Sequence, residues 1–297
     1  MLGDLQSANR DGTTLCSEWA SSWHDLSTMQ ELKRFQIRGV PGLVTRAAIE
    51  NRIVDFWIPK GGSDELLLAH DGQNIFDGRT STFRGQTWKM AQSAIRVSRK
   101  LGKKPPAIIA TWHSSTKSDP WGRAKDLTPQ DIFETGQYLN PKFRPDNVEI
   151  KLHGNDYLNL MFGTIVPLIS PGIAPENTAM IGSSMGGLCT LYALKNHHQS
   201  FSTALALSPH WVLSDESFVQ KMIQLIPETG THRIWMSRGT KGLDRSYETL
   251  QNLADELMYA KGYSHSQFST KVYPRSSHNE RSWSRYLDEP MEFWLGR

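Results

Sequence analysis

The 297-residue sequence predicts an α/β fold, with a mostly parallel central sheet and helices on both faces. Two observations lead to this prediction. Short continuous apolar runs recur along the chain, and such runs are typical of strands that are covered on both faces of a sheet. Amphipathic segments with apolar residues at i, i+3 and i+4 lie between several of these runs, as expected for helices that cover a sheet.

The expected strands follow one another from about residue 52. The first one, residues 52–58, is rich in β-branched and aromatic residues and stops at a Pro-Lys-Gly-Gly turn signal. A helix is expected directly after residue 184, and another from Tyr247 to Met258, with Gly262 where a helix-ending glycine would stand. The remaining strands are expected at residues 66–70, 107–111, 179–182, 202–207, 233–237 and 267–273.

The domain organisation is predicted from where this alternation holds. We expect one domain over residues 46–297, preceded by a peripheral extension over residues 1–45, which is the least regular part of the chain. Residues 113–150 interrupt the alternation of strands and helices, because they contain several prolines and little periodicity. They also carry aromatic residues that a disordered loop would lack. A lid-like insertion that faces the substrate is therefore expected there, and a surface insertion without a role is the alternative.

Composition excludes several classes of protein. Lys and Arg number 33 against 30 Asp and Glu, so the basic excess of a nucleic-acid-binding protein is missing. The sequence contains no apolar run of membrane-spanning length. No apolar signal segment is visible between Met1 and Arg10, so we expect a cytoplasmic location. The two cysteines, Cys16 and Cys189, are interpreted as small apolar residues rather than as a disulfide bridge.

A Gly-x-Ser-x-Gly motif at residues 182–186 stands between a predicted strand and a predicted helix. A serine at the tip of such a sharp turn is held in strained backbone geometry, and the flanking glycines prevent side chains from colliding. The start of the following helix directs unpaired N–H groups toward the same point. Ser184 is therefore the predicted nucleophile, with a plain tight turn as the alternative.

A serine nucleophile needs a base, and the base needs an orienting acid, in the chain order Ser, acid, His for this architecture. His278 lies in the loop after the last expected strand and is the predicted base. Asp244 lies in the loop after the preceding strand and is the predicted acid, although it could instead cap the next helix. Glu248 and Asp255 are rival acids within that helix.

Oxyanion donors are expected at the backbone N–H of Met185 and at that of Gly72 or Gln73, in the loop after an early strand. His70 and Asp71 precede this loop, but no third metal ligand is spaced to join them, so no metal and no cofactor is expected. Four further residues are candidates for substrate contacts, although aromatic residues are more often plain core. They are His210, Trp211, Trp112 and Trp121.

Taken together, these residues resemble the esterase D-like family of α/β-hydrolases, which includes S-formylglutathione hydrolases, feruloyl, acetylxylan and siderophore esterases, and mycolyltransferases. The resemblance runs from about Arg52 to the C-terminus. It implies the α/β-hydrolase fold, with Ser184 as nucleophile, His278 as base, Asp244 as acid and oxyanion donors at Met185 and near Gly72. The marks of the resemblance are residues 70–74, Trp88, residues 156–158, 182–187 and 206–209, and His278 followed by Trp283.

One departure from the family pattern concerns the acid. Family members often carry an acidic residue soon after the glycine of this loop, where the present chain has Thr240, Lys241 and Gly242. The function expected is a serine esterase that hydrolyses small-molecule carboxylic esters through an acyl-enzyme intermediate. An acyltransferase on the same scaffold is the first alternative, and a non-catalytic binding protein is the second. No nucleic-acid or membrane partner is expected, and a homo-oligomer is left open.

Overall fold

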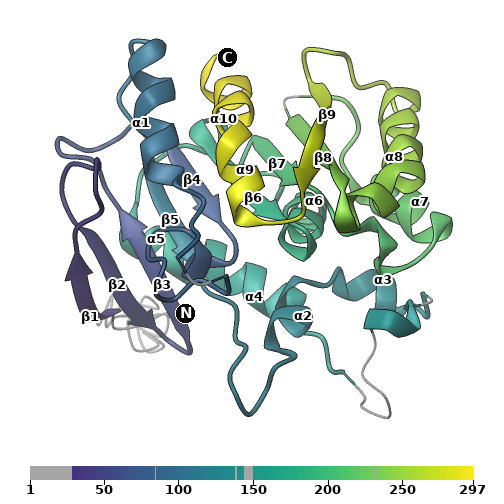
Figure 1. The fold of residues 1–297 in the computed structure, drawn as a ribbon, viewed down its shortest axis with the longest axis horizontal. Helices are drawn as coiled ribbons and strands as arrows, with labels where there is room; N and C mark the ends of the chain where they lie inside the picture. The colour runs from purple at the N-terminus through teal and green to yellow at the C-terminus, as the bar shows by residue number, and fades with distance from the viewer. Residues whose placement is uncertain (1–28, 84, 138, 144–149, 231) are drawn as a thin grey trace, which may run out of the picture.

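The computed structural model describes residues 29–83, 85–137, 139–143, 150–230 and 232–297 (Figure 1). They form a nine-stranded sheet in the order β1-β2-β3-β5-β4-β6-β7-β8-β9. The first pairings, as far as β3 with β5, are antiparallel, and all pairings from β5 to β9 are parallel. The strands are β1 Met29–Phe35, β2 Val44–Ile49, β3 Arg52–Trp57, β4 Leu66–Ala69, β5 Ala107–Thr111, β6 Thr178–Ser183, β7 Thr203–Leu207, β8 Arg233–Lys241 and β9 Phe268–Ser277.

Helices cover both faces of this sheet. Successive residues of the central strands point to opposite faces. Leu67 belongs to the apolar cluster that also contains residues of α1, α9 and α10, whereas Leu68 belongs to the cluster that contains residues of α4, α6, α7 and α8. The helices are α1 Met90–Lys100, α2 Gly122–Leu127, α3 Gln130–Glu134, α4 Gly154–Leu160, α5 Val166–Ile169, α6 Met185–His197, α7 Glu216–Leu225, α8 Glu248–Ala260, α9 Glu280–Tyr286 and α10 Asp288–Leu295. Figure 1 shows α1 beside α10 at one end of the molecule and α2 with α3 at the other.

Every strand and helix expected from the sequence is present, and the mostly parallel sheet with helices on both faces is confirmed. Strand β8 extends to Lys241 and β9 to Ser277, beyond the apolar runs that predicted them. The two strands stay paired through a register irregularity between Gly239 and Lys241. At Gly239 an added Cβ would lie 2.3 Å from the Ser276 carbonyl oxygen, so only glycine permits this close pairing.

The N-terminal part differs from the sequence expectation. Residues 1–45 were expected to form an irregular extension, but β1 and the start of β2 lie in this segment and add two antiparallel strands to the sheet. Strand β1 is almost entirely exposed, so its sequence lacks the apolar alternation from which a strand could have been predicted. Residues 1–28, including Cys16, lie outside the described residues.

The described part of the 113–150 insertion packs against the domain through α2 and α3. Leu127 and Ile132 belong to the apolar core beneath these helices. Asp126 is fully buried and accepts two hydrogen bonds from Arg52 of β3, at 2.6 and 2.8 Å. A buried carboxylate requires such pairing, so this helix is anchored on the sheet. A lid role for the insertion stays a prediction.

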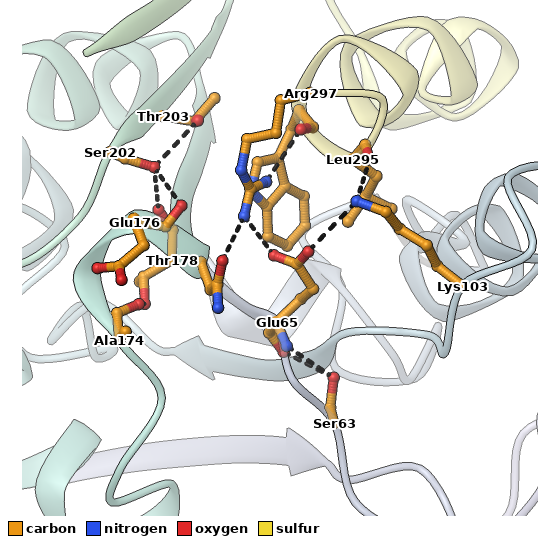
Figure 2. A network of polar contacts seen from close by, with 12 residues as sticks. Ser63, Glu65, Lys103, Ala174, Glu176, Thr178, Ser202, Thr203, Leu295 and Arg297 are labelled. Carbon is orange, nitrogen blue, oxygen red and sulfur yellow. Dashed lines mark hydrogen bonds and ion pairs between the residues drawn. The ribbon is translucent and has the colours of Figure 1, made fainter. Parts of the chain in front are cut away.

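The end of α10 is tied to the beginning of β4 by a polar network (Figure 2). Arg297 donates to Glu65 at 2.6 Å and to Asn177 at 3.0 Å. Lys103 donates to the Leu295 carbonyl at 2.6 Å and lies 3.6 Å from the other Glu65 oxygen. The contacts join four segments that are distant in sequence, on the side of the molecule opposite α2. None of the described helices is long and apolar enough to cross a lipid bilayer.

Candidate active site

Ser184 occupies a strained backbone position between β6 and α6. Its φ is 56° and its ψ is −124°, values that side-chain-bearing residues rarely adopt. An added Cβ at Gly182 would lie 2.3 Å from the carbonyl oxygen of Gly186. Glycine at position 182 therefore prevents a collision with the start of α6, as the motif predicts. The turn therefore has the geometry of a nucleophile elbow.

Main-chain hydrogen bonds from neighbouring strand ends hold this strained residue. The Ser184 N–H donates to the carbonyl of Leu207 at 3.0 Å, and its own carbonyl accepts from the N–H of His210 at 3.1 Å. Ser184 itself is buried, with 8% of its surface exposed. The end of β7 thus fixes the backbone that presents the hydroxyl.

His278 and Asp244 meet through a short hydrogen bond, with 2.6 Å between Nδ1 of the imidazole and Oδ1 of the carboxylate. His278 directly follows β9, and Asp244 belongs to the 3-10 helix η6 (Gly242–Tyr247), which directly follows β8. Because β8 and β9 are parallel neighbours, their ends lie at the same edge of the sheet. The structure therefore brings together the two residues that the sequence proposed as base and acid.

Asp244 is fully buried, and both of its oxygens are occupied. Oδ2 accepts from the Gly239 N–H at 2.7 Å and from the Ser208 hydroxyl at 2.9 Å. The first residues of α8 receive no side-chain cap, so the alternative in which Asp244 caps this helix does not describe its contacts. Three hydrogen-bond partners, His278, Gly239 and Ser208, therefore hold this carboxylate in one orientation.

The rival acids lie elsewhere. Glu248 pairs with Arg238 at 2.8 Å, and its side chain is 62% exposed. Asp255 accepts from Gln251 at 2.7 Å and from Thr270 at 2.8 Å. Neither of these carboxylates forms a hydrogen bond with His278 among the described residues.

Aromatic rings surround His278. Trp283 meets it edge to face with ring centroids 5.0 Å apart, and Tyr247 does so at 5.5 Å. The Trp283 ring N–H donates to Ser208 at 3.2 Å, so the same tryptophan contacts the base and the hydroxyl that supports the acid. The Tyr247 hydroxyl lies 2.5 Å from Nδ1 of His210. His210 in turn donates its backbone N–H to the Ser184 carbonyl, so Tyr247 lies between the His278 ring and the residue that holds the Ser184 backbone.

The expected oxyanion donors have free N–H groups. Within the described part of the chain, Met185, Gly72 and Gln73 do not donate their backbone N–H to any acceptor. The loop before η1 (Gly72–Asn74) lies over the elbow, since an added Cβ at Gly186 would stand 3.3 Å from Oδ2 of Asp71. Gly72 is required by packing, because an added Cβ there would lie 2.3 Å from the backbone oxygen of β5 at residue 110.

An ion pair between the half-buried Arg123 and the buried Asp71 lies beside this loop. Arg123 of α2 donates to both oxygens of Asp71, at 2.7 and 2.8 Å, and to the Ser183 carbonyl at 3.4 Å. Burial acts to raise the pKa of Asp71, but the guanidinium outweighs it and holds that pKa below its usual value. Burial lowers the pKa of His70 to about 4, and its Nδ1 lies 2.9 Å from the Tyr157 hydroxyl. Both oxygens of Asp71 and Nδ1 of His70 thus have protein partners, whereas the buried Nε2 of His70 has none among the described residues.

The candidate substrate-contacting residues occupy different environments. Trp211 is fully buried and donates its ring N–H to Gln251 at 2.8 Å, which places it in the core. Trp112 packs against Gly72 and beneath the Arg46 guanidinium, 4.5 Å from its ring centroid. Trp121 begins α2. His210 is buried next to Ser184, so it is the nearest of these residues to the proposed nucleophile.

Sequence reasoning gave no role to several residues that the structure brings to the site. Arg123 lies in the insertion, where the sequence shows no regular pattern from which its neighbours in the fold could be predicted. Tyr247 stands three positions after Asp244 in the same turn, and it was read only as the first apolar residue of a helix. Ser208 belongs to the quoted Ala-Leu-Ser-Pro mark, which could have pointed to a supporting role.

The fold and this elbow define an α/β-hydrolase. The model of the Esterase family, described as "Putative esterase", matches residues 140–292, which is more than half of the chain. The chain belongs to this family. A search of curated protein sequences gave no match.

Solved structures share the fold at low sequence identity. The siderophore hydrolase EstA from Aspergillus nidulans matches with a TM-score of 0.58 at 16% identity, over 97% of this chain and 100% of EstA. The BES protein from Bacillus cereus matches with a TM-score of 0.54 at 14% identity, over 97% and 99%. The enterobactin esterase FES from Shigella flexneri matches with a TM-score of 0.53 at 15% identity, over 91% of this chain. The present chain spans only 60% of the length of that esterase.

Proposed function

We propose that the chain is a serine esterase that hydrolyses carboxylic esters of small molecules, with Ser184 as nucleophile, His278 as base and Asp244 as acid. The observation that carries the proposal is the 2.6 Å hydrogen bond between His278 and Asp244, at the strand ends beside a strained serine. Membership of the esterase family supports the class of reaction.

In the proposed reaction, His278 takes the proton of the Ser184 hydroxyl as its oxygen attacks the ester carbonyl. Asp244 keeps the imidazole oriented and stabilises the positive charge that develops on it. The free N–H groups of Met185 and of Gly72 or Gln73 stabilise the oxyanion. The alcohol then leaves with the proton from His278, and water releases the acyl group by the reverse sequence.

Two of the similar solved structures are a siderophore hydrolase and an enterobactin esterase. Siderophore-type esters therefore belong in a substrate panel together with simple acyl esters and thioesters of varied chain length. Activity confined to thioesters would contradict the carboxylesterase assignment.

The proposal is tested with p-nitrophenyl acetate on the wild type and on Ser184→Ala. We expect kcat to fall by about 10⁴-fold or more in the variant, with labelling by a fluorophosphonate lost as well. Ser284→Ala is the matched control and should behave as the wild type, because it removes a hydroxyl in α9 that, among the described residues, bonds only to the Arg281 carbonyl. Equal rates for Ser184→Ala and the wild type would overturn the proposal.

The same assay separates hydrolysis from acyl transfer. With an added alcohol acceptor, an esterase should still release the free acid as its main product, whereas an acyltransferase would form a new ester. Product analysis by mass spectrometry distinguishes the two outcomes.

A further inference from the structure

The loop that carries the proposed oxyanion donors is tied to the segment that carries the proposed base. Asn74 is the last residue of η1, next to Gln73, and Glu280 is the first residue of α9, directly after the loop of His278. The Asn74 side chain donates from Nδ2 to Oε1 of Glu280 at 3.2 Å. Both residues are buried, with 6% and 3% of their surfaces exposed. One side-chain hydrogen bond therefore joins two segments that lie 206 positions apart in the chain.

The hydrogen bonds of Asn74 determine its orientation. Its Oδ1 accepts from the Thr82 N–H at 2.8 Å. Because a main-chain N–H can only donate, Oδ1 has to lie on this side, and Nδ2 faces Glu280. The Asn74 N–H donates to the Asp71 carbonyl at 2.8 Å, and its carbonyl accepts from the Trp88 N–H at 3.2 Å. The side chain and the main chain of Asn74 are therefore held by the same turn.

A second connection between the two segments runs through aromatic rings. The Trp88 and Trp283 rings pack with their centroids 5.4 Å apart, and Trp283 meets the His278 imidazole edge to face at 5.0 Å. These contacts keep the segments together. A hydrogen bond depends more sharply on distance and angle than apolar packing does, so the contact between Asn74 and Glu280 defines their relative placement more narrowly.

We propose that Asn74 and Glu280 are positioning residues of the oxyanion site: their hydrogen bond fixes η1, which carries the proposed donors, relative to the segment that carries His278. This inference rests on the proposed function, because that function assigns the roles of donor and base. During attack the oxyanion forms beside the donors while the imidazole takes the proton of the nucleophile, so both groups have to be in place together. Asn74 and Glu280 act through these groups and not by contact with the substrate.

The protonation state of Glu280 does not decide whether the contact forms. Burial raises the pKa of Glu280, the charge of Asp71 acts in the same direction, and Arg123 opposes them. A carboxylate accepts at either oxygen, and a carboxylic acid still accepts at its carbonyl oxygen. The second oxygen, Oε2, is buried without a hydrogen-bond partner among the described residues. Burying such an oxygen costs folding free energy, so stability alone does not explain a carboxyl group at this position.

The first test compares Glu280→Gln with Glu280→Leu in the full chain. The glutamine amide oxygen can still accept from Asn74, whereas leucine offers no acceptor. With p-nitrophenyl acetate we expect Glu280→Gln to keep kcat within about threefold of the wild type, and Glu280→Leu to lose about tenfold, with KM within about twofold in both. The loss should stay below the about 10²–10³-fold that removal of an oxyanion donor causes. Equal kcat values for the two variants would contradict the positioning role.

The second test exchanges the two groups. Asn74→Asp keeps the acceptor for Thr82 but places a second carboxylate opposite Glu280, and like charges so close repel each other. At about pH 8 we expect kcat to fall about tenfold. When Glu280→Gln is added, the amide can donate to the new carboxylate, and the hydrogen bond returns with donor and acceptor reversed. The double variant should recover kcat to within about threefold of the wild type. A double variant as slow as Asn74→Asp would overturn the inference.

Asn155→Asp is the matched control for Asn74→Asp. Nδ2 of Asn155 donates to Asp131 at 2.7 Å, and its Oδ1 accepts from the Tyr192 hydroxyl at 2.8 Å. It therefore also lies between a donor and a carboxylate, and none of these three residues belongs to the proposed site. This variant should have a lower thermal midpoint and the wild-type kcat. A loss of kcat as large as that of Asn74→Asp would show that general destabilisation causes both, and the positioning role would fail.

The two proposals fail in different ways. If Ser184→Ala keeps full activity, the proposed function itself fails. If Ser184→Ala is inactive and Glu280→Leu and Asn74→Asp both keep the wild-type kcat, the positioning role alone fails. If Asn74→Asp folds poorly, the comparison of Glu280→Gln with Glu280→Leu decides, because both leave the contact between Asn74 and Thr82 in place.

Discussion

Oδ1 of Asp244 faces His278 at 2.6 Å because Oδ2 of the same carboxylate is occupied by the N–H of Gly239, 2.7 Å away. The hydroxyl of Ser208 adds a second donor to Oδ2. A main-chain N–H can only donate, so it requires an oxygen at this position. The contact therefore determines which atom of residue 244 is presented to the imidazole.

Asp244→Asn should consequently place its NH₂ group toward His278. The imidazole would then accept at Nδ1 and carry its proton on Nε2, the atom that has to take the proton of Ser184. We expect kcat for p-nitrophenyl acetate to fall by about 10³–10⁴-fold with a small change in thermal midpoint. Asp255→Asn, a change at a rival carboxylate, should leave kcat within a few-fold of the wild type. The reverse ranking of the two variants would transfer the acid role to Asp255.

Gly182→Ala should destabilise the elbow. The new Cβ would lie 2.3 Å from the Gly186 carbonyl oxygen, and we expect the free energy of unfolding to fall by roughly 2–4 kcal/mol together with esterase activity. Gly163→Ala is the control, because an added Cβ there meets nothing within 4 Å. That variant should gain up to about 1 kcal/mol. Urea unfolding measures both, and equal midpoints would contradict the steric account.

Asp126→Asn should leave the buried Arg52 guanidinium without a counter-charge. The carboxylate accepts from Arg52 at 2.6 and 2.8 Å and from the Ser114 N–H at 2.7 Å. Breaking such a buried pair costs about 3–5 kcal/mol of unfolding free energy. Asp64→Asn removes the partner of Lys104 in an exposed pair and should cost less than about 1 kcal/mol. Similar losses of unfolding free energy in the two variants, measured by urea unfolding, would show that burial does not determine the effect of removing a carboxylate.

Acid should destabilise the fold through His70. Its pKa is lowered to about 4 by burial, against about 6.5 in an unfolded chain. Between these values the unfolded state binds more protons, so the free energy of unfolding falls as the pH decreases, by up to about 1.4 kcal/mol per unit. His70→Asn cannot titrate and can still bond to Tyr157. Its urea midpoint should decline less than that of the wild type between pH 6.5 and 4.5, and parallel declines would refute the assignment.

The sheet was predictable from sequence because its central strands are buried on both faces and so appear as continuous apolar runs. Strand β1 was not, since it is exposed and paired along one edge only. The Gly-x-Ser-x-Gly motif predicted the elbow at Ser184, and the chain order of strand ends predicted that Asp244 and His278 would lie close together. The roles of Arg123 and Tyr247 could not be predicted in this way, because their contacts depend on the packing of an irregular segment and of a tight turn. The cytoplasmic location and the oligomeric state stay predictions.

The six-residue helix α2 is held by two charge pairs from successive turns, Arg123 to Asp71 and Asp126 to Arg52. An outward movement of this helix would separate both pairs and leave Asp71 and Arg52 buried without a counter-charge. The free energy lost would exceed what the binding of a small ester is expected to supply. We therefore expect α2 to stay in place when an ester binds. The shape that α2 gives to the surface beside Ser184 would then select among substrates before any of them binds.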